Sequence, residues 1–473
     1  MSLTGRRKII VPYTEINSSN VQNILNLALP IHLTNVQEMS YLYNYYKGIQ
    51  PILARKKEVR PEILNKIVVN LAQEIVSFKT GYLLWKPIQY VARKEDVEKE
   101  DLALLGDYAV DDCKDSKDKK LANDQSICGV GELFIRPNPK YYVGSEDEAP
   151  YETIVADPRM AFAIYSSEVG NKKIGGVLLD VRMENGNLIY KCQVFTDTEY
   201  FEFENNAPNP VVAKENVLGQ IPVVEYPLNE DRLGDFEIVE PLLNAINLTI
   251  SNQLDGVEQF IQALMVFKNV DIDKDSFRQL KELGAIKIKD NTDGTKTIEA
   301  NVSYLNQELN QTQVNSLVKV LCQFVREIVG MPAQADGTTN DGSNNGAQVL
   351  KGGWYSAEAR TSNTEMIFKK SEKESLKIIL YICNVMTLGA FNLKLSDLEI
   401  KFTRRNYEDI LAKAQVLVQL LQTNKVAPRL AFATCGLFAD PDQAYEESRL
   451  YVEDLRNLTA QQAINIANEN QDN

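Results

Sequence analysis

The sequence predicts an α+β protein, in which helical regions and a β-rich region follow one another along the chain. Residues from about 36 to 90 carry apolar side chains at helical spacing, and so do residues from about 236 onward. Between them, residues from about 127 to 226 have the short alternating runs that are typical of strands. With 473 residues, of which 44% are hydrophobic and 25% charged, the chain is long enough for two to four domains.

The first helical region follows the only histidine of the chain, His32. The surrounding stretch, LALPIHLTNVQEMSYLYNYYKG, predicts a loop that leads into an amphipathic helix, so we expect His32 at the surface or at a cap. Gly81 stands where a C-cap glycine would end a second helix. The apolar positions of this second helix are Ile67, Leu71, Ile75 and Phe78.

The β-rich region contains the dipeptide Asn185-Gly186 between two runs of strand-forming residues, which is the strongest short signal for a hairpin. Prolines punctuate the end of this region at positions 208, 210, 222 and 227.

Two apolar stripes at helical spacing come next, and they predict two helices that pack as antiparallel neighbours. The alternative for each is an ordinary core helix. Between them, AIKIKDNTDGTKTIEANV predicts a hairpin that turns at Asp293-Gly294, within a highly charged excursion. The first stripe, on a helix about 40 Å long, comprises Val239, Leu243, Ile246, Ile250, Leu254, Val257, Ile261 and Leu264. The second comprises Val314, Leu317, Leu321, Phe324 and Ile328.

The segment PAQADGTTNDGSNNGAQVLKGG, residues 332–353, separates two predicted helices and contains almost nothing apolar. Gly337 and Gly342 have the spacing of a phosphate-binding loop, but Ser343 replaces the required lysine, and Asp336 and Asp341 would repel phosphate. A nucleotide site is therefore not expected. A solvated linker and a functional loop both stay open, because a structureless loop of this length inside a domain is usually functional or disordered.

The C-terminal third is predicted to be helical apart from one strand. Residues 347–389 contain no proline and form one predicted helix of about 65 Å, whose poor apolar face suggests burial against another subunit. LEIKFTRRNYED then predicts a strand, and about three helices follow, the last capped at Asp440-Pro441-Asp442. The polar residues 461–473 are expected to be disordered.

Composition excludes several classes of site. With one histidine, a catalytic triad or a zinc site built on histidines would have to use His32. No two of the six cysteines lie closer than 15 residues, so no C-x-x-C motif exists, and reduced cysteines suit synthesis in the cytoplasm. No signal peptide or membrane-spanning stretch is expected. The net charge of −14 argues against a general nucleic-acid binder. Catalysis by carboxylates alone remains possible in principle. No cofactor or metal is expected.

Several stretches together resemble one family, the portal proteins of tailed bacteriophages, and most closely those of long-tailed siphophages of Gram-positive hosts. They are YYKGIQPILARK, NKIVVNLAQEIVSFKTGYLLWKPIQY, GMPAQADGTTNDGSNNGAQVLK and LEIKFTRRNYED. No single motif is specific, but their order and spacing from about Tyr41 to Arg456 are. One departure is Trp85, where relatives often have glycine.

The resemblance implies a portal fold, built as a ring of twelve subunits at one capsid vertex. Residues 1–235 would form the wing, 236–264 and 305–332 the stem, and 265–304 the clip. Residues 333–346 would form a tunnel loop, 347–397 a long helix and 398–460 the crown. The tunnel loop candidates are Asp336, Gly337, Asn340, Asp341, Gly342, Asn344, Asn345 and Gly346.

The implied function is a channel for DNA, in the virion, assembled in the host cytoplasm. It implies no catalytic residue in this chain, because ATP hydrolysis during packaging would belong to the motor. Its implied partners are the terminase large subunit that pumps DNA, a head-completion adaptor, the major capsid and scaffolding proteins, and double-stranded DNA that passes without sequence readout. An acidic wall gives phosphates few ion pairs to break. Channel-lining candidates are Asp255, Glu258 and Lys351, for which solvated surface positions are the alternative. Clip candidates for adaptor contact are Lys281, Lys287, Lys289, Asp293, Gly294 and Lys296.

Two other functions stay open from sequence. One is a carboxylate-dependent enzyme with the Gly-rich segment as an active-site lid. The other is a different oligomeric component of the junction between head and tail.

Overall fold

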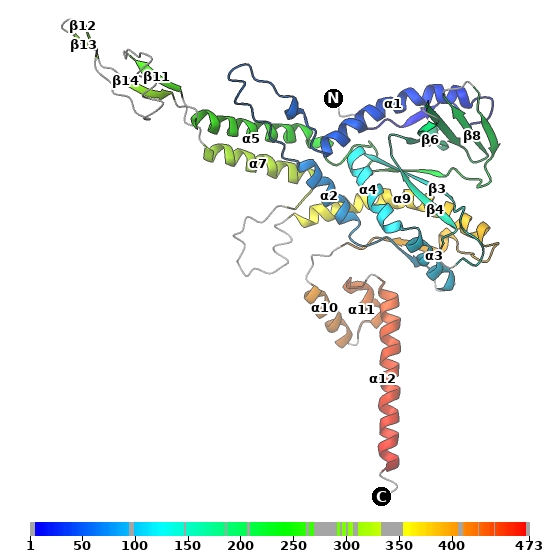
Figure 1. Cartoon of the computed structure of the whole chain (residues 1–473). Coiled ribbons are helices and arrows are strands. Elements are labelled where there is room, and N and C mark those ends of the chain that lie inside the picture. Colours follow the sequence, from blue (N-terminus) through cyan, green and yellow to red (C-terminus); the bar gives the residue numbers. More distant parts are fainter. Residues whose placement is uncertain are drawn as a thin grey trace. The chain divides into compact units, whose positions relative to one another are not determined.

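The structure, a computed structural model, is an α+β chain that divides into two compact units (Figure 1). The larger unit contains residues 1–47, 71–239 and 326–473, and the smaller unit contains residues 48–70 and 240–325. The described residues are 5–93, 99–145, 148–184, 187–205, 209–261, 264–268, 291–293, 296–298, 301–305, 311–332, 353–404, 410–423, 425–438 and 440–469.

A six-stranded sheet in the order β1-β5-β6-β7-β8-β9 forms one part of the larger unit. Helix α1 packs its apolar side chains against this sheet. The strands are antiparallel except that β1 pairs in parallel with β5. The elements are β1 (Ile9–Val11), α1 (Val21–Tyr46), β5 (Ala161–Ser166), β6 (Lys173–Glu184), β7 (Asn187–Phe195), β8 (Glu199–Glu204) and β9 (Val212–Glu215).

A second core of the larger unit lies around the antiparallel sheet β10-β3-β4, against which α4 and α9 pack. A two-stranded sheet, β15-β2, adjoins the same core. The elements are α2 (Leu71–Leu83), β2 (Gln89–Ala92), α3 (Lys99–Asp111), α4 (Lys114–Cys128), β3 (Val130–Pro137), β4 (Tyr151–Ala156), β10 (Val223–Pro227), η2 (Glu237–Val239), α9 (Trp354–Met386), η3 (Leu395–Asp397) and β15 (Leu398–Lys401).

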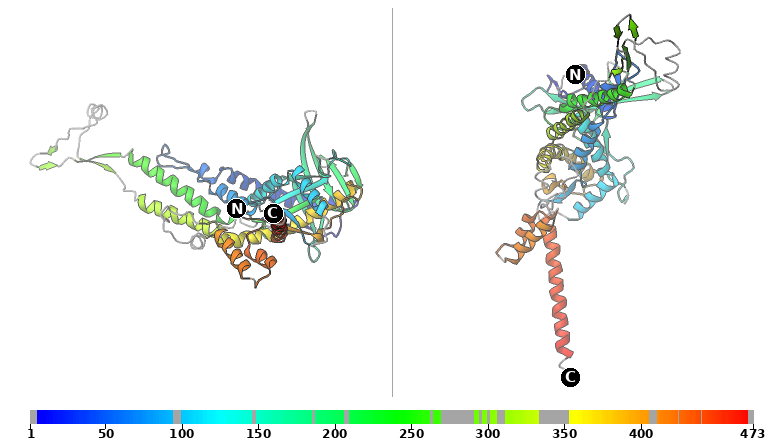
Figure 2. Two further views of the ribbon diagram at one scale, coloured as in Figure 1. Left: turned by 90° about the horizontal axis from the view of Figure 1, so that it is seen from below. Right: turned by 90° about the vertical axis from the view of Figure 1, so that its left-hand side faces the viewer.

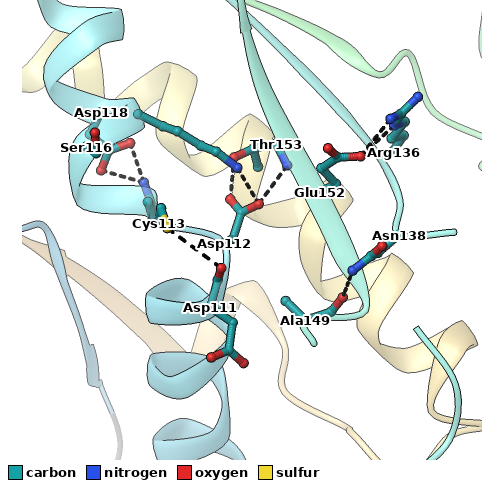
Figure 3. A network of polar contacts seen from close by, with 12 residues as sticks. Asp111, Asp112, Cys113, Ser116, Asp118, Arg136, Asn138, Ala149, Glu152 and Thr153 are labelled. Atoms are coloured by element: carbon teal, nitrogen blue, oxygen red, sulfur yellow. Dashed lines mark hydrogen bonds and ion pairs between the residues drawn. The ribbon is translucent and has the colours of Figure 1, made fainter. Parts of the chain in front are cut away.

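The junction of α3 and α4 is fixed by a buried carboxylate (Figure 3). Asp112 accepts the backbone N–H of Thr153 on β4 at 3.0 Å and also the hydroxyl of the same residue. Lys117 pairs with Asp112 at 2.6 Å. Cys113, which follows, takes a left-handed backbone conformation with φ 53° and separates the two helices. The turn is therefore anchored to the sheet through side chains rather than through a glycine.

The smaller unit contains helix α5 and helix α7 as far as Val325, and the two helices run alongside each other (Figures 1 and 2). Gln253 on α5 donates to Asn315 on α7 at 3.0 Å. The hairpin predicted at Asp293-Gly294 is present as β12 and β13, whose register pairs Asp293 with Lys296. The elements are η1 (Pro51–Ala54), α5 (Glu240–Ile261), β11 (Leu264–Lys268), β12 (Asn291–Asp293), β13 (Lys296–Ile298), β14 (Asn301–Leu305) and α7 (Gln311–Val329).

The C-terminal part has the predicted strand followed by three helices, α10 (Ile410–Gln422), α11 (Pro428–Cys435) and α12 (Pro441–Glu469). Asp440 caps α12 as expected, since its carboxylate accepts the N–H groups of Asp442 and Gln443 at 3.1 Å each. The helix includes residues 461–469, which were predicted to be disordered. Its Ala- and Gln-containing sequence there has sufficient helix propensity to continue the helix.

The prediction for the first helical region was wrong in two places. Helix α1 already begins at Val21 and includes Pro30, because burial of its apolar face against the sheet offsets the hydrogen bond that Pro30 removes. The second helix begins only at Leu71 and ends at Leu83, so that Ile67 precedes it and Gly81 lies inside it. In contrast, β6 and β7 pair Glu184 with Asn187, which confirms the predicted hairpin.

The prediction of a surface position for His32 was also wrong, since its exposed fraction is 1%. The ring stacks on Phe162 with centroids 4.2 Å apart, and Nε2 lies 2.9 Å from the carbonyl oxygen of Arg159. A carbonyl only accepts, so Nε2 carries the proton. Burial lowers the pKa of His32 from 6.5 to about 4, so the ring is neutral at pH 7.

The stability of the larger unit should therefore fall in mild acid. The unfolded chain binds a proton at His32 below pH 6.5, whereas the folded chain resists it until about pH 4, so this contribution is complete above pH 6.5 and is lost on acidification. The difference between the two pKa values corresponds to about 3 kcal/mol of unfolding free energy. We expect the difference in unfolding free energy between the wild type and His32→Phe to shrink or reverse between pH 6.5 and 4. A difference that does not change with pH would contradict this assignment.

Candidate functional site

The segment Gly48–Asn70, which we call the strap, lies along helix α5 in the smaller unit. Apart from η1 it contains no helix or strand. Its backbone N–H groups consequently need acceptors from elsewhere in the fold.

Three polar side chains of α5, spaced four residues apart, supply these acceptors. Alternate strap residues donate to them in antiparallel order. The N–H of Val69 donates to Asn247 Oδ1 at 2.8 Å, that of Ile67 to Ser251 Oγ at 2.9 Å, and that of Asn65 to Asp255 Oδ1 at 2.7 Å. Four helical residues advance about 6 Å and two extended residues about 6.6 Å, so the two repeats match. The helix thus holds the strap as a neighbouring strand would.

Asp255 is the charged end of this series, and its exposed fraction is 4%. Its second oxygen pairs with Arg55 at 3.0 Å and Lys57 at 3.6 Å, both of which belong to the strap. Burial alone would raise the pKa of Asp255, but the hydrogen bonds from Asn65 and the two cations hold it below its ordinary value. Asp255 therefore stays ionised, with its charge compensated by the strap.

Asn247 is the other end, and it is fully buried. Besides accepting from Val69, its amide nitrogen donates to Gln50 Oε1 at 2.5 Å. Gln50 in turn donates to Asn70 Oδ1 at 3.1 Å, which joins the two ends of the strap. A polar network that is satisfied in this way fixes the register between strap and helix.

Helix α9 is held in the larger unit by a buried ionic cluster around Glu372, whose exposed fraction is 1%. Its carboxylate accepts from the hydroxyls of Tyr90 at 2.6 Å and Tyr226 at 2.8 Å, and pairs with Lys114 at 2.8 Å. Lys114 also binds Asp118 at 2.7 Å. These residues come from α9, β2, β10 and α4, so one side chain of the long helix links three other elements.

The protonation states in this cluster follow from its geometry. Burial lowers the pKa of Lys114, but Asp118 and Glu372 outweigh burial and hold it above its ordinary value. Burial likewise raises the pKa of Glu372, but Lys114 and the two tyrosine hydroxyls lower it below its ordinary value. Both groups are therefore charged at neutral pH.

The ends of the segment 333–352 meet in space. Helix α7 ends at Val329 with Gly330 at φ 72°, and the N–H groups of Gly330 and Met331 bond back to Glu327 and Arg326, as in a Schellman motif. The positive φ of Gly330 favours glycine, and a Cβ there would stand 2.3 Å from Arg360 Cδ, so the arginine would have to move as well. A Cβ built on Gly353, just before α9, would lie 3.7 Å from Pro332 Cα. The segment 333–352 thus begins and ends at neighbouring positions, between the end of α7 and the start of α9.

A comparison of the sequence with known proteins shows the family of the chain. Residues 26–458 match the model of the family described as "Phage portal protein, SPP1 Gp6-like". The chain belongs to this phage portal protein family. Portal proteins are structural, ring-forming components associated with the phage capsid. No curated protein matches the chain. Within the described residues, no helix of this portal protein combines the length and apolar character needed to cross a membrane.

Most of the sequence-predicted site residues of the portal protein fall outside the described residues. This holds for the tunnel loop candidates at 336–346, for Lys351, and for the clip candidates Lys281, Lys287, Lys289 and Gly294. Asp293 and Lys296 are opposite each other in the β12–β13 pair. Glu258 is half-buried on α5, and Asp255 is buried under the strap.

Sequence reasoning missed the strap of the portal protein and the cluster around Glu372. A signal for the strap was present in Asn247, Ser251 and Asp255, which repeat every fourth residue and so lie on one face of α5. The cluster left no comparable signal, because Glu372 lies in the polar run KKSEKESLK and resembles a solvated residue.

Proposed function

We propose that this chain assembles into a ring at one capsid vertex that serves as the DNA channel, used by the terminase for packaging and later for ejection of the genome. The observation that carries this proposal, beside the family match, is an uncovered apolar stripe on α7. The exposed fractions along one face are 50% for Leu317, 44% for Val320, 48% for Phe324 and 40% for Ile328. An exposed apolar stripe on a helix is typical of a surface that packs against a partner. A second copy of the chain is the partner that a ring supplies.

Changing this stripe should abolish the ring. We expect Phe324→Asp, which places a charge in the apolar contact, to leave folded monomers or small oligomers in native mass spectrometry and electron microscopy. The matched control is Lys319→Asp, because Lys319 is exposed on the opposite face of α7. Intact rings of Phe324→Asp with wild-type thermal stability would contradict the proposed role of the stripe.

We propose that residues 333–346 form the loop that narrows the channel. Its glycines, asparagines and two aspartates are suited to lie beside moving DNA without binding phosphate. The adjacency of Pro332 and Gly353 supports this proposal, since a segment whose ends meet can vary without disturbing its helices. Channel-facing candidates besides the loop are Glu258 and Lys351, whereas the Asp255 carboxylate is already bound by the strap.

Deletion of residues 337–345 tests the loop. The remaining residues can still span the short distance between Pro332 and Gly353, so we expect ring assembly to be unchanged and packaging or retention of DNA to be impaired. Ring formation is measured by electron microscopy, and packaging by nuclease protection of DNA in assembled heads. Loss of rings by a folded variant would argue against the loop assignment, and normal packaging would show that the loop is dispensable.

We further propose that the region 265–304 is the clip that meets the head-completion adaptor. The charged hairpin with Asp293 and Lys296 at its paired ends, together with Lys281, Lys287, Lys289 and Gly294, provides the candidate contact residues. In this proposal, twelve copies of the chain form the ring, which assembles in the host cytoplasm together with scaffolding and major capsid proteins.

A further inference from the structure

A small cavity lies in the larger unit between the N-terminal segment, α1, β3 and β5. The centre of a water-sized sphere can occupy about 20 Å³ of it, which is room for one water molecule and for no organic ligand. His32 and Glu132 both line the cavity, with exposed fractions of 1% and 2%. Each has one buried polar atom, His32 Nδ1 and Glu132 Oε2, without a hydrogen-bond partner among the described residues.

The hydrogen-bonding character of His32 Nδ1 is fixed. Because Nε2 donates its proton to the carbonyl oxygen of Arg159, Nδ1 of the neutral ring is an acceptor only. Burial keeps the ring neutral, since it lowers the pKa of His32 to about 4. This nitrogen consequently requires a donor from within the cavity.

Glu132 has the complementary character. It lies on β3 directly opposite Glu225 of β10, and Glu225 is held ionised by Arg232 at 2.8 and 2.9 Å and by the hydroxyl of Tyr165. Burial, together with the neighbouring charge of Glu225, raises the pKa of Glu132 well above its ordinary value. Burial and the charge of Glu225 therefore favour the protonated form of Glu132, which has an O–H group to donate.

We propose that this cavity is an internal hydration site, in which one water molecule accepts from the carboxyl group of Glu132 and donates to Nδ1 of His32. The pairing satisfies both buried atoms at once. A water molecule can donate one hydrogen bond to His32 Nδ1 and at the same time accept one from the Glu132 carboxyl group.

The other small occupants fit less well. A cation would lie among the guanidinium groups of Arg6, Arg7 and Arg232, which also line the cavity, and would meet no ionised ligand at Glu132. An anion would meet the lone pair of His32 Nδ1. The guanidinium groups that could bind an anion already pair with carboxylates, Arg6 with Glu237 at 2.5 Å and Arg232 with Glu225.

A cryo-electron microscopy map of the assembled ring, at a resolution that shows other internal water molecules, tests the proposal directly. We expect one isolated peak about 2.6 to 3.2 Å from both His32 Nδ1 and Glu132 Oε2. An empty cavity, direct contact between the two side chains, or a peak with the short and numerous ligand distances of an ion would each overturn the proposal.

Two variants at one position separate the bridge from simple packing. Glu132→Gln keeps an N–H donor, so we expect the peak to remain and the midpoint of thermal unfolding to change by about 2 °C or less. Glu132→Leu removes the donor, so we expect the peak to vanish and the midpoint to fall by several degrees. A peak that persists unchanged in Glu132→Leu would refute the bridge. If Glu132→Leu does not fold, the map of Glu132→Gln decides, because loss of the peak there contradicts the proposal.

Discussion

Replacing Glu372 by alanine should destabilise the larger unit more than any other single change considered above. The substitution leaves Lys114 buried with only Asp118 beside it and removes the acceptor of the Tyr90 and Tyr226 hydroxyls. Breaking a buried ion pair in this way costs about 3 to 5 kcal/mol, because Lys114 loses one of its two carboxylates and the Tyr90 hydroxyl loses its acceptor without regaining water. The Tyr226 hydroxyl, in contrast, keeps Ser375 at 2.6 Å. Urea unfolding followed by tryptophan fluorescence measures the loss, since both tryptophans, Trp85 and Trp354, belong to the larger unit.

The matched control is Glu374→Ala, two residues further along α9. Glu374 pairs with Lys173, but 45% of its side chain is exposed, so its removal should cost at most about 1 kcal/mol. Equal losses for the two variants would show that the ionic cluster contributes no more than a surface pair. A Glu372→Ala variant with wild-type stability would show that Asp118 alone compensates Lys114.

The cluster also contributes to fixing the long helix α9, whose two halves differ in polarity. The C-terminal half of α9 buries Leu376, Ile379 and Cys383 in the core, whereas its N-terminal half is largely polar. At the N-terminal end, Trp354 packs against Phe78 and Tyr82 of α2. Glu372 lies between these two contacts, one turn after the fully buried Phe368. Ionic and aromatic contacts within the larger unit thus hold a helix whose poor apolar face had suggested burial against another subunit.

Local patterns were sufficient to predict much of the fold. The β6–β7 hairpin followed from Asn185-Gly186, and the helices α5 and α7 followed from their apolar stripes, because each signal acts over a few residues. The order of a helical, a β-rich and a second helical region, and the capped start of α12, were predicted for the same reason.

The errors have one physical cause, which is that distant residues override local preference. Residues 65–70 have a helical pattern but are extended, because the side chains of α5 accept their N–H groups from about 180 residues away. Pro30 suggested a loop, yet the sheet under α1 holds the helix intact. His32 and Glu132 appear as ordinary polar residues in the sequence, and only the folded chain places them on one cavity. Side-chain chemistry at such sites depends on partners that single-sequence patterns do not show.

The second large effect is expected in the smaller unit, where the substitution Asn247→Leu should release the strap from α5. Leucine has a similar size, but it removes the acceptor of the Val69 N–H and the donor to Gln50. Asn247 is fully buried, so water does not readily replace the two hydrogen bonds that its side chain makes. At about 2 kcal/mol for each buried hydrogen bond lost, the loss in the smaller unit is roughly 4 kcal/mol.

Hydrogen exchange measured by mass spectrometry reports the local stability of the strap directly. We expect exchange across the strap, and especially in peptides that contain Val69 and Ile67, to become faster by two or more orders of magnitude in Asn247→Leu, as about 1.4 kcal/mol corresponds to a factor of ten. The control is Asn252→Ala on the exposed side of α5, where one hydrogen bond to Arg55 is lost next to water. Strap protection that survives in Asn247→Leu would mean that Ser251 and Asp255 suffice to hold the segment. Ser251 and Asp255 accept the N–H groups of Ile67 and Asn65 but not that of Val69. In that case exchange should be slow at Asn65 and fast at Val69, so the contributions of the individual hydrogen bonds can be distinguished.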